Sequence, residues 1–236
     1  MKRRYKMLWG EAGAAIVMLA VLLYITIPRF LAAAQNINTP RYFPDPQFRL
    51  AVEKFMRVDP GERFHANDAA QKTGPFHCSN SRIENIRGIE FFTGITTFNC
   101  SDNSIQSLDL TKNTALQNLI CAGNRLVEVD CMKQTGLREL ICYKNPLRKI
   151  LFPRMKQSFS LKRIICNSCR LEELDLSLHF NLEELDCSSN RLTSLDLSQC
   201  SSLRFLSCSN NTLGHLDIAN NTALEVVWCA SNTITA

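Results

Sequence analysis

The sequence predicts a solenoid of stacked units, each contributing one short parallel β-strand, and two observations lead to this prediction. Seven cysteines recur every 21 residues, apart from one gap of 24: Cys100, Cys121, Cys142, Cys166, Cys187, Cys208 and Cys229. An apolar residue stands two positions before each of them, so both side chains point to the same side of a strand. A fixed period of this length is typical of solenoids, in which a stack buries apolar side chains that one unit cannot bury alone.

The repeat unit reads Leu-x-x-Leu-x-Cys-x-x-Asn-x-Leu-x-x-Leu-Asp-Leu-Ser-x-Asn-x-x, most clearly over residues 182–202 and 203–223. This unit resembles a leucine-rich repeat with cysteine in place of the third strand leucine. The resemblance implies a leucine-rich repeat solenoid, a curved right-handed coil with its parallel strands on the concave face. Two apolar ladders follow the same period: Leu116, Leu137, Leu161, Leu182, Leu203 and Leu224, and Phe98, Leu119, Leu140, Ile164, Leu185, Leu206 and Val227.

Packing, disulfides and zinc binding are three alternatives for the cysteine ladder, and packing is favoured because a buried cysteine behaves as a small apolar side chain. Disulfides would strain the sheet, because strands about 4.8 Å apart hold Cβ atoms at that distance, whereas a relaxed bridge needs about 3.8 Å. Zinc sites use closely spaced pairs, and only Cys166 and Cys169 have that spacing. Among all the cysteines, Cys200 falls in a turn and is the one we most expect to be exposed.

Two further sets of polar residues recur with the units and are interpreted as scaffold. The turn asparagines are expected to satisfy backbone groups: Asn103, Asn124, Asn145, Asn190, Asn211 and Asn232. The aspartates of the Leu-Asp-Leu step form a regular ladder rather than an acid–base pair: Asp109, Asp130, Asp175, Asp196 and Asp217. The four histidines share no frame with acids or thiols. We therefore predict that the protein is not an enzyme and has no catalytic residue, bound metal or cofactor.

Residues 1–34 predict export. A basic start, an apolar run over residues 12–27 and an Ala-x-Ala site at residues 32–34 fit a cleaved signal peptide. Alternatively, residues 9–34 are long enough to span a bilayer at a tilt as an uncleaved membrane anchor. Both alternatives place the repeats outside the cytoplasm, either extracellular or in the cell envelope.

The same N-terminal segment also resembles the helix of a type IV pilin or pseudopilin. When Met7 is counted as the first residue, Glu11 is the fifth and Pro28 the twenty-second, as in that family. The sequence departs from the family at Lys6, which stands where the pilin peptidase needs glycine. Cleaved signal peptide, anchor and pilin-like helix therefore remain three alternatives for residues 1–34.

The rest of the chain divides into a linker at 35–42, an N-terminal cap at 43–77 and leucine-rich repeats at 78–236. Helical spacing of Phe48, Val52 and Phe55 predicts a cap helix that begins at Pro46. This cap and the cysteine-bearing units resemble secreted bacterial leucine-rich repeat proteins of the internalin-like kind. Caps of that family often hold a calcium-loop-like stretch, but residues 58–68 lack its alternating oxygen ligands, so no calcium is expected.

Charge and chain ends limit the functions that the sequence supports. Beyond residue 34 there are 22 basic and 21 acidic residues, so no clustered basic face argues for nucleic-acid binding. The gap of 24 residues is an insertion on the loop side, over residues 153–160, and is interpreted as a surface bulge. The sequence stops in mid-unit without a polar closing repeat, which solenoids use for solubility. Two alternatives follow: either the product is truncated, or this end meets another chain.

The function that the sequence favours is an exported, non-enzymatic recognition module that binds a protein, peptide or glycan on its concave face. One alternative is a structural cell-envelope component that is membrane-anchored and self-associates through its open C-terminal end. Another is a thiol-based redox or metal-storage protein that uses the cysteine ladder. The binding residues are expected among outward strand positions: Ile120, Ile141, Tyr143, Arg163, Ile165, Asn167, Asp186, Phe205 and Trp228. Exposed isoleucines beside Tyr, Arg and Trp indicate a contact surface, because these three types dominate interface hot spots.

Overall fold

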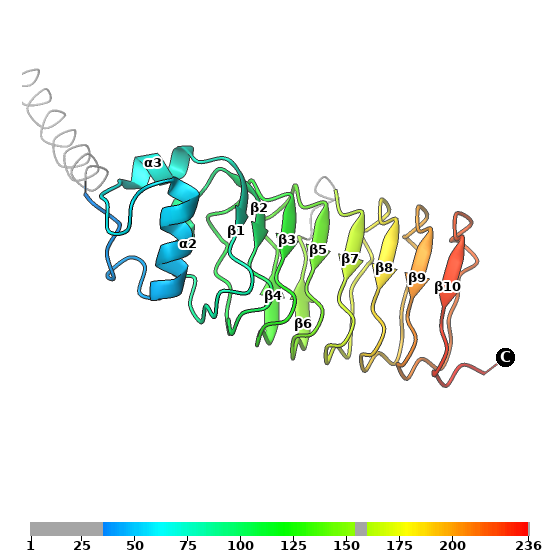
Figure 1. Ribbon diagram of the computed structural model, residues 1–236. Coiled ribbons are helices and arrows are strands. Elements are labelled where there is room, and N and C mark those ends of the chain that lie inside the picture. The colour runs from blue at the N-terminus through cyan, green and yellow to red at the C-terminus, as the bar shows by residue number, and fades with distance from the viewer. Residues whose placement is uncertain (1–34, 154–159, 236) are drawn as a thin grey trace, which may run out of the picture.

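The computed structural model describes residues 35–153 and 160–235, which form an elongated solenoid (Figure 1). Its main sheet has eight parallel strands in the order β1-β2-β3-β5-β7-β8-β9-β10. These strands are β1 (Gly74–His77), β2 (Ile95–Asn99), β3 (Asn118–Ile120), β5 (Glu139–Ile141), β7 (Arg163–Ile165), β8 (Glu184–Asp186), β9 (Phe205–Ser207) and β10 (Val226–Trp228). The predicted leader at 1–34 and most of the 153–160 insertion lie outside the described residues. Within the described ranges, no helix combines the length and apolar character needed to cross a membrane.

The predicted leucine-rich repeat solenoid is confirmed strand by strand. Leu140 of β5 pairs in register with Leu119 of β3 on one side and Ile164 of β7 on the other, and all three side chains are completely buried. A second sheet of two parallel strands, β4 (Glu128–Asp130) and β6 (Lys149–Leu151), lies apart from the main sheet, at the Leu-Asp-Leu step of two repeats (Figure 1).

The cysteine ladder packs in the core, as predicted, except at Cys229, which is partly exposed. Cys187 and Cys208 are completely buried, and all 11 cysteines, which lie within the described residues, are free thiols. Burial raises the pKa of the Cys208 thiol to about 11. It raises the pKa of the thiols deeper in the stack well above their ordinary value: Cys100, Cys121, Cys142 and Cys166. At neutral pH these thiols are therefore protonated, and they fill space as apolar side chains do.

The expectation that Cys200 is exposed was wrong. Its side chain has no accessible surface, and its thiol lies 4.0 Å from the carbonyl oxygen of Leu176. The turn that carries Cys200 stacks on the turn of the preceding repeat, which removes its side chain from water. Other repeats hold a buried polar residue at the same position: Asn113, Gln134, His179 and Asn221. Asn221, one repeat further on, donates from Nδ2 to the carbonyls of Leu197 and Cys200. The asparagine of the Leu-Asp-Leu-Ser-x-Asn consensus was the signal for a second buried ladder that Cys200 joins.

The turn asparagines satisfy backbone groups, as the sequence predicted, and they also connect consecutive repeats. Asn211 Nδ2 donates to the carbonyl of Cys208 in its own repeat and to that of Cys187 in the preceding repeat, both at 3.0 Å. Its Oδ1 accepts from the backbone N–H of Leu192, also at 3.0 Å. Each asparagine thus satisfies backbone groups of two turns at once, which water cannot reach inside the stack. Cys169 replaces one asparagine and donates from Sγ to the Cys142 carbonyl at 3.6 Å.

The cap closes the β1 end of the sheet with two α-helices, α2 (Pro46–Met56) and α3 (Ala66–Gln71), followed by the 3-10 helix η1 (Ile89–Phe91). The predicted helix at Pro46 is confirmed. Asp45 caps it, because its Oδ1 accepts from the backbone N–H groups of Gln47 and Phe48. Phe55 stacks on Phe76 of β1 with the ring centroids 4.5 Å apart. This aromatic layer shields the edge of the sheet from water.

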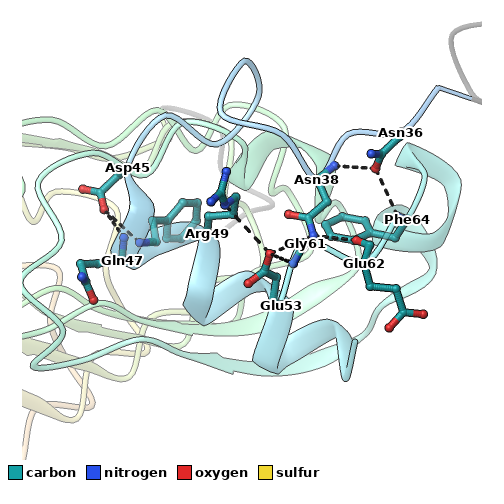
Figure 2. A network of polar contacts seen from close by, with 10 residues as sticks. Asn36, Asn38, Asp45, Gln47, Arg49, Glu53, Gly61, Glu62 and Phe64 are labelled. Atoms are coloured by element: carbon teal, nitrogen blue, oxygen red, sulfur yellow. Dashed lines mark hydrogen bonds and ion pairs between the residues drawn. The ribbon is translucent and has the colours of Figure 1, made fainter. Parts of the chain in front are cut away.

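Residues 36–43, expected partly as a linker, pack onto the cap. Ile37 and Phe43 are buried. Asn38 Nδ2 donates to Glu53 Oε1 at 2.9 Å and to the carbonyl of Glu62 at 2.7 Å (Figure 2). Glu53 Oε1 also accepts from the backbone N–H of Gly61, which satisfies a carboxylate that is almost fully buried in α2. These bonds hold the incoming chain, α2 and the following loop together.

Candidate binding face

The outward side chains of the main sheet form two neighbouring columns, which we call the strand face. One column occupies the first position of each short strand: Asn118, Glu139, Arg163, Glu184, Phe205 and Val226. The other occupies the third position: Asn99, Ile120, Ile141, Ile165, Asp186, Ser207 and Trp228. Because the strands are in register, residues of one column are direct neighbours about 4.8 Å apart across the sheet.

Three isoleucines form an apolar stripe on the strand face. Ile120 pairs with Ile141, and Ile141 pairs with Ile165. All three are partly exposed, and so is Tyr143, which lies beyond the end of β5. The ammonium group of Lys144 lies 5.8 Å from the centre of the Tyr143 ring. The stripe and this tyrosine therefore offer adjacent apolar area to a partner.

A charged ladder flanks the isoleucine stripe. Arg163 on β7 contacts Glu139 on β5 at 2.9 Å and Glu184 on β8 at 2.8 Å. Desolvation alone would lower the pKa of Arg163, but the hydrogen bonds and charges of the two glutamates raise it overall. Such partly exposed pairs contribute about 0.2–1 kcal/mol each to stability. Their main effect is to hold the arginine on the strand face between the two glutamates.

An aromatic pair lies nearer the C-terminal end of the same face. The rings of Phe205 and Trp228 meet edge to face with centroids 5.1 Å apart, and 58% of the Trp228 surface is exposed. Ile165 is two strands away from Phe205 and three from Trp228, about 10 and 15 Å. The aromatic pair is thus a second contact area rather than part of the isoleucine stripe.

The remaining predicted site residues, Asn167 and Asp186, have intramolecular partners. Asp186 Oδ1 accepts from the backbone N–H and the hydroxyl of Ser188, at 3.0 and 2.6 Å. Asn167 Nδ2 donates to the Ser168 hydroxyl at 3.3 Å. The structure therefore brings together Ile120, Ile141, Tyr143, Arg163 and Ile165, with Asn167 and Asp186 beside them.

Sequence reasoning missed the two glutamates of the charged ladder. Glu139, Arg163 and Glu184 occupy the same frame of consecutive repeats, and opposite charges directly across parallel strands were the signal.

Away from the strand face, a groove of about 630 Å³ is lined by Ile150, Leu174 and other residues near the Leu-Asp-Leu step. In the described part of the chain, no group of three or more His, Cys, Asp or Glu residues is arranged to hold a metal ion.

Comparisons with known proteins agree with this architecture. The family model for leucine-rich repeats (two copies) matches residues 180–218. Internalin J of Listeria monocytogenes is 35% identical over 89 residues, which is 38% of this chain and 10% of that protein. The chain therefore spans about a tenth of the length of this curated relative.

Solved structures extend the similarity over most of the described repeats. The functional domain of InlJ from Listeria monocytogenes, which includes a cysteine ladder, is 28% identical with a TM-score of 0.53. That match covers 86% of this chain and 53% of the InlJ chain. InlF, an internalin from the same organism, is 17% identical with a TM-score of 0.65. That match covers 86% of this chain and 68% of the InlF chain, and it supports the fold alone.

Proposed function

We propose that this chain, whose repeats are similar to those of internalins, is an exported, non-enzymatic recognition module that binds its partner on the strand face. The partner is a protein, a peptide or a glycan. One observation carries the proposal, namely the partly exposed stripe of Ile120, Ile141 and Ile165 beside Tyr143 and Arg163. Displaying apolar side chains to water has a free-energy cost that a bound partner would remove.

The side-chain types support contact with a partner more than they support the sheet alone. Isoleucine favours strands, which accounts for some of the stripe. The tyrosine and the arginine are not needed for strand formation, and both are enriched in the energetic centres of interfaces. Because Arg163 is already held by Glu139 and Glu184, little side-chain entropy would be lost when a partner contacts it.

The basic start, apolar run and Ala-x-Ala site within residues 1–34 support export. Export is also compatible with the burial of most of the thiols. Exported compartments oxidise exposed cysteines, and here the ladder thiols from Cys100 to Cys208 are buried, with raised pKa values such as those of Cys121 and Cys142. A protonated thiol inside the core is a poor nucleophile. The buried thiols therefore need no reducing compartment. The absence of a shared frame among histidines, acids and thiols supports a non-enzymatic role.

The test is a comparison of variants on the two sides of the coil. Purified full chain is probed against arrays of peptides, glycans and purified envelope proteins. We expect that Ile141→Asp and Tyr143→Ala abolish binding of every probe that the wild-type chain retains, while the thermal midpoint stays nearly unchanged. Ser194→Asp, an exposed position at the Leu-Asp-Leu step, is the matched control and should bind normally. Wild-type affinity of Ile141→Asp would exclude the strand face as the binding site.

A second candidate is a structural component of the cell envelope that is membrane-anchored and self-associates. The observation that favours it is the exposed apolar edge at β10, where Val226 and Trp228 are both exposed. Membrane fractionation and light scattering of the full chain together separate the two candidates, because a structural scaffold should be both held in the membrane and self-associating.

A further inference from the structure

One turn of the solenoid interrupts the ladder of turn asparagines. In the repeat of β7, Cys169 stands where the repeats on both sides carry an asparagine. Asn190, one repeat further on, donates from Nδ2 to the carbonyl of Cys166 at 2.9 Å and to that of Cys187 at 3.0 Å, so it joins two turns. A thiol has a single, weakly donated proton, so Cys169 cannot make both bonds. The turns that follow β5 and β7, which are neighbouring strands (Figure 1), are therefore joined less firmly than those linked by an asparagine.

The Cys169 sulfur lies against the preceding repeat. It is 3.6 Å from the carbonyl oxygen of Cys142 and 3.6 Å from that of Asn167. Each ladder asparagine also bonds to the carbonyl of the cysteine in its own repeat, but within the described residues Cys169 has no such bond to Cys166. The thiol of Cys169 therefore contacts Cys142 across the β5–β7 joint, which we define as the contact between residues 142–145 and 166–169.

Cys142 and Cys169 form a pair with unequal access to water. Cys142 is completely buried, whereas Cys169 is partly exposed. Burial and, to a smaller extent, neighbouring thiols that include Cys169 raise the pKa of the Cys142 thiol, so the two thiols are close enough to interact. Burial also raises the pKa of Cys169, although backbone N–H groups of the preceding turn lower it in part. Cys169 is therefore the member of the pair that a reagent in solution reaches first.

The strain that argues against bridging the cysteine ladder does not apply to this pair. Ladder cysteines are fixed by paired strands about 4.8 Å apart, whereas Cys169 lies in the turn beyond β7. We propose that Cys142 and Cys169 form a disulfide across the β5–β7 joint when the chain meets a small-molecule disulfide as the oxidant. This bond would supply the connection that an asparagine makes at the neighbouring turns.

The reaction is a thiol–disulfide exchange in two steps. Cys169 releases its proton, and its sulfur attacks the small-molecule disulfide, which forms a mixed disulfide and expels one thiolate. Cys142 then releases its proton, and its sulfur attacks the Cys169 sulfur, which forms the new disulfide and expels the second thiolate. The two cysteines lose two electrons and two protons in total, and the oxidant leaves as two molecules of thiol. Because the thiolate is the reactive form, the rate should rise about tenfold per pH unit below the pKa of the thiols.

The disulfide would hold part of the strand face. Tyr143 directly follows Cys142, and Asn167 lies two residues before Cys169, so both belong to the turns that the bond would join. Oxidation should reduce the freedom of Tyr143 and Asn167 relative to each other, and so lower the entropy cost of binding a partner there. This consequence rests on the proposed binding function, whereas formation of the disulfide is independent of it.

The first test maps the cysteines after the native full chain, in detergent, is incubated with glutathione disulfide at mildly alkaline pH. Trypsin, which cuts after Lys and Arg, should release residues 139–144 linked to residues 164–170, and fragmentation of this pair should place the link on Cys169. The incubation continues until Cys229, which is also partly exposed, carries glutathione and so shows that the oxidant is active. A link to Cys166, a lasting glutathione adduct on Cys169, or an unmodified Cys169 beside a modified Cys229 would overturn the proposal.

The second test uses Cys169→Asn, which restores the asparagine of the ladder and should therefore fold. Glutathione disulfide should raise the urea midpoint of the wild type, because a cross-link restricts the unfolded chain, and should leave that of Cys169→Asn unchanged. Cys142→Ala should keep glutathione attached to Cys169 and gain nothing in its midpoint. Equal midpoint shifts in the wild type and Cys169→Asn would mean that the β5–β7 joint is not bridged, and would overturn the proposal whatever the outcome of the ligand-binding experiments.

Discussion

The two edges of the main sheet carry similar apolar residues in very different surroundings. At the covered edge, Phe76 of β1 is completely buried beneath the cap helices, whereas Val227 of β10 is partly exposed and Trp228 largely so. Both strands continue the same ladder of inward side chains, Phe76 through Phe98 and onward to Val227. The difference shows that burial in this solenoid comes from the neighbouring repeat and not from residue type. Replacing a residue at the same repeat position should therefore reduce the free energy of unfolding strongly in the interior and only slightly at the β10 edge.

Alkaline pH should produce the largest effect, because it acts on all buried thiols at once. The folded state raises their pKa, to about 11 for Cys208 and well above the ordinary value for Cys121 and Cys142. The unfolded chain releases these protons near pH 9, so stability is fully present below pH 9 and falls as pH rises toward the folded pKa. Each such thiol reduces the free energy of unfolding by about 1.4 kcal/mol per pH unit in that window.

The measurement is urea denaturation at a series of pH values from 7 to 11, compared with Cys187→Ala. We expect the stability of the wild type to fall steeply above pH 9 and the variant to fall with a shallower slope, by about one proton. Equal slopes would mean that Cys187 ionises as readily in the folded chain as in the unfolded chain, which contradicts its burial.

The covered edge can be tested with Phe76→Ala. This substitution removes a ring that packs against Phe48, Phe55 and Phe92, so it should reduce the free energy of unfolding by about 3–5 kcal/mol. Val227→Ala is the matched change at the open edge and should cost less than about 1 kcal/mol. Urea titrations monitored by far-ultraviolet circular dichroism measure both. Equal losses would show that the two edges are equally buried in solution.

Cysteines at the same position of different repeats allow the interior of the solenoid to be compared with the β10 edge for a single residue type. Cys187→Ser places a hydroxyl in an apolar row and should destabilise the protein by about 1–3 kcal/mol. Cys229→Ser, in the partly exposed repeat at the open edge, should have little effect. The same contrast should appear in labelling with a bulky maleimide, which is expected to modify Cys229 in the folded chain and Cys187 only after denaturation. Rapid labelling of native Cys187 would contradict the packing role.

The ladders and the turn asparagines could be predicted from the sequence because they recur with the period of the repeat. The cap helix could be predicted because its apolar residues have helical spacing. A 21-residue repeat fixes which side chains stack, so Leu140 and Cys187 could be assigned to the core without coordinates. Cys200 was misplaced because turns are usually exposed, and only the stacking of one turn on the next buries it. The packing of Ile37 onto the cap was not expected, since a short polar stretch carries no periodic signal.

The candidate site was predicted less completely than the fold. Outward strand positions follow from the alternation of side chains, so Ile120, Ile141 and Ile165 were correctly placed as neighbours. The bridge from Arg163 to two glutamates depends on side-chain reach across strands, which the repeat alone does not specify. The identity of the partner depends on a second molecule and lies beyond any pattern in one chain.

The smallest effect concerns the turn that follows each strand. Ser189 and Ser231 occupy the same frame with φ of 54° and 56°, a left-handed conformation that costs a residue with a side chain about 1–2 kcal/mol. Gly123 already fills this frame in an earlier repeat, with φ of 63°. Ser189→Gly should therefore stabilise the protein by about 0.5–1 kcal/mol, after the entropy that glycine loses on folding is subtracted.

Ser231→Gly makes the same backbone change in the last described repeat, so it distinguishes local from global unfolding. If the repeat at the open edge unfolds together with the interior, both glycine variants should raise the urea midpoint equally. If that repeat opens separately, as weakly buried segments do, only Ser189→Gly should raise it. Hydrogen exchange at Trp228 and Leu206 would then show whether Ser231→Gly slows the opening of the edge alone. We expect this second result, because β10 has a neighbour on one side only, and a gain from Ser231→Gly equal to that from Ser189→Gly would contradict it.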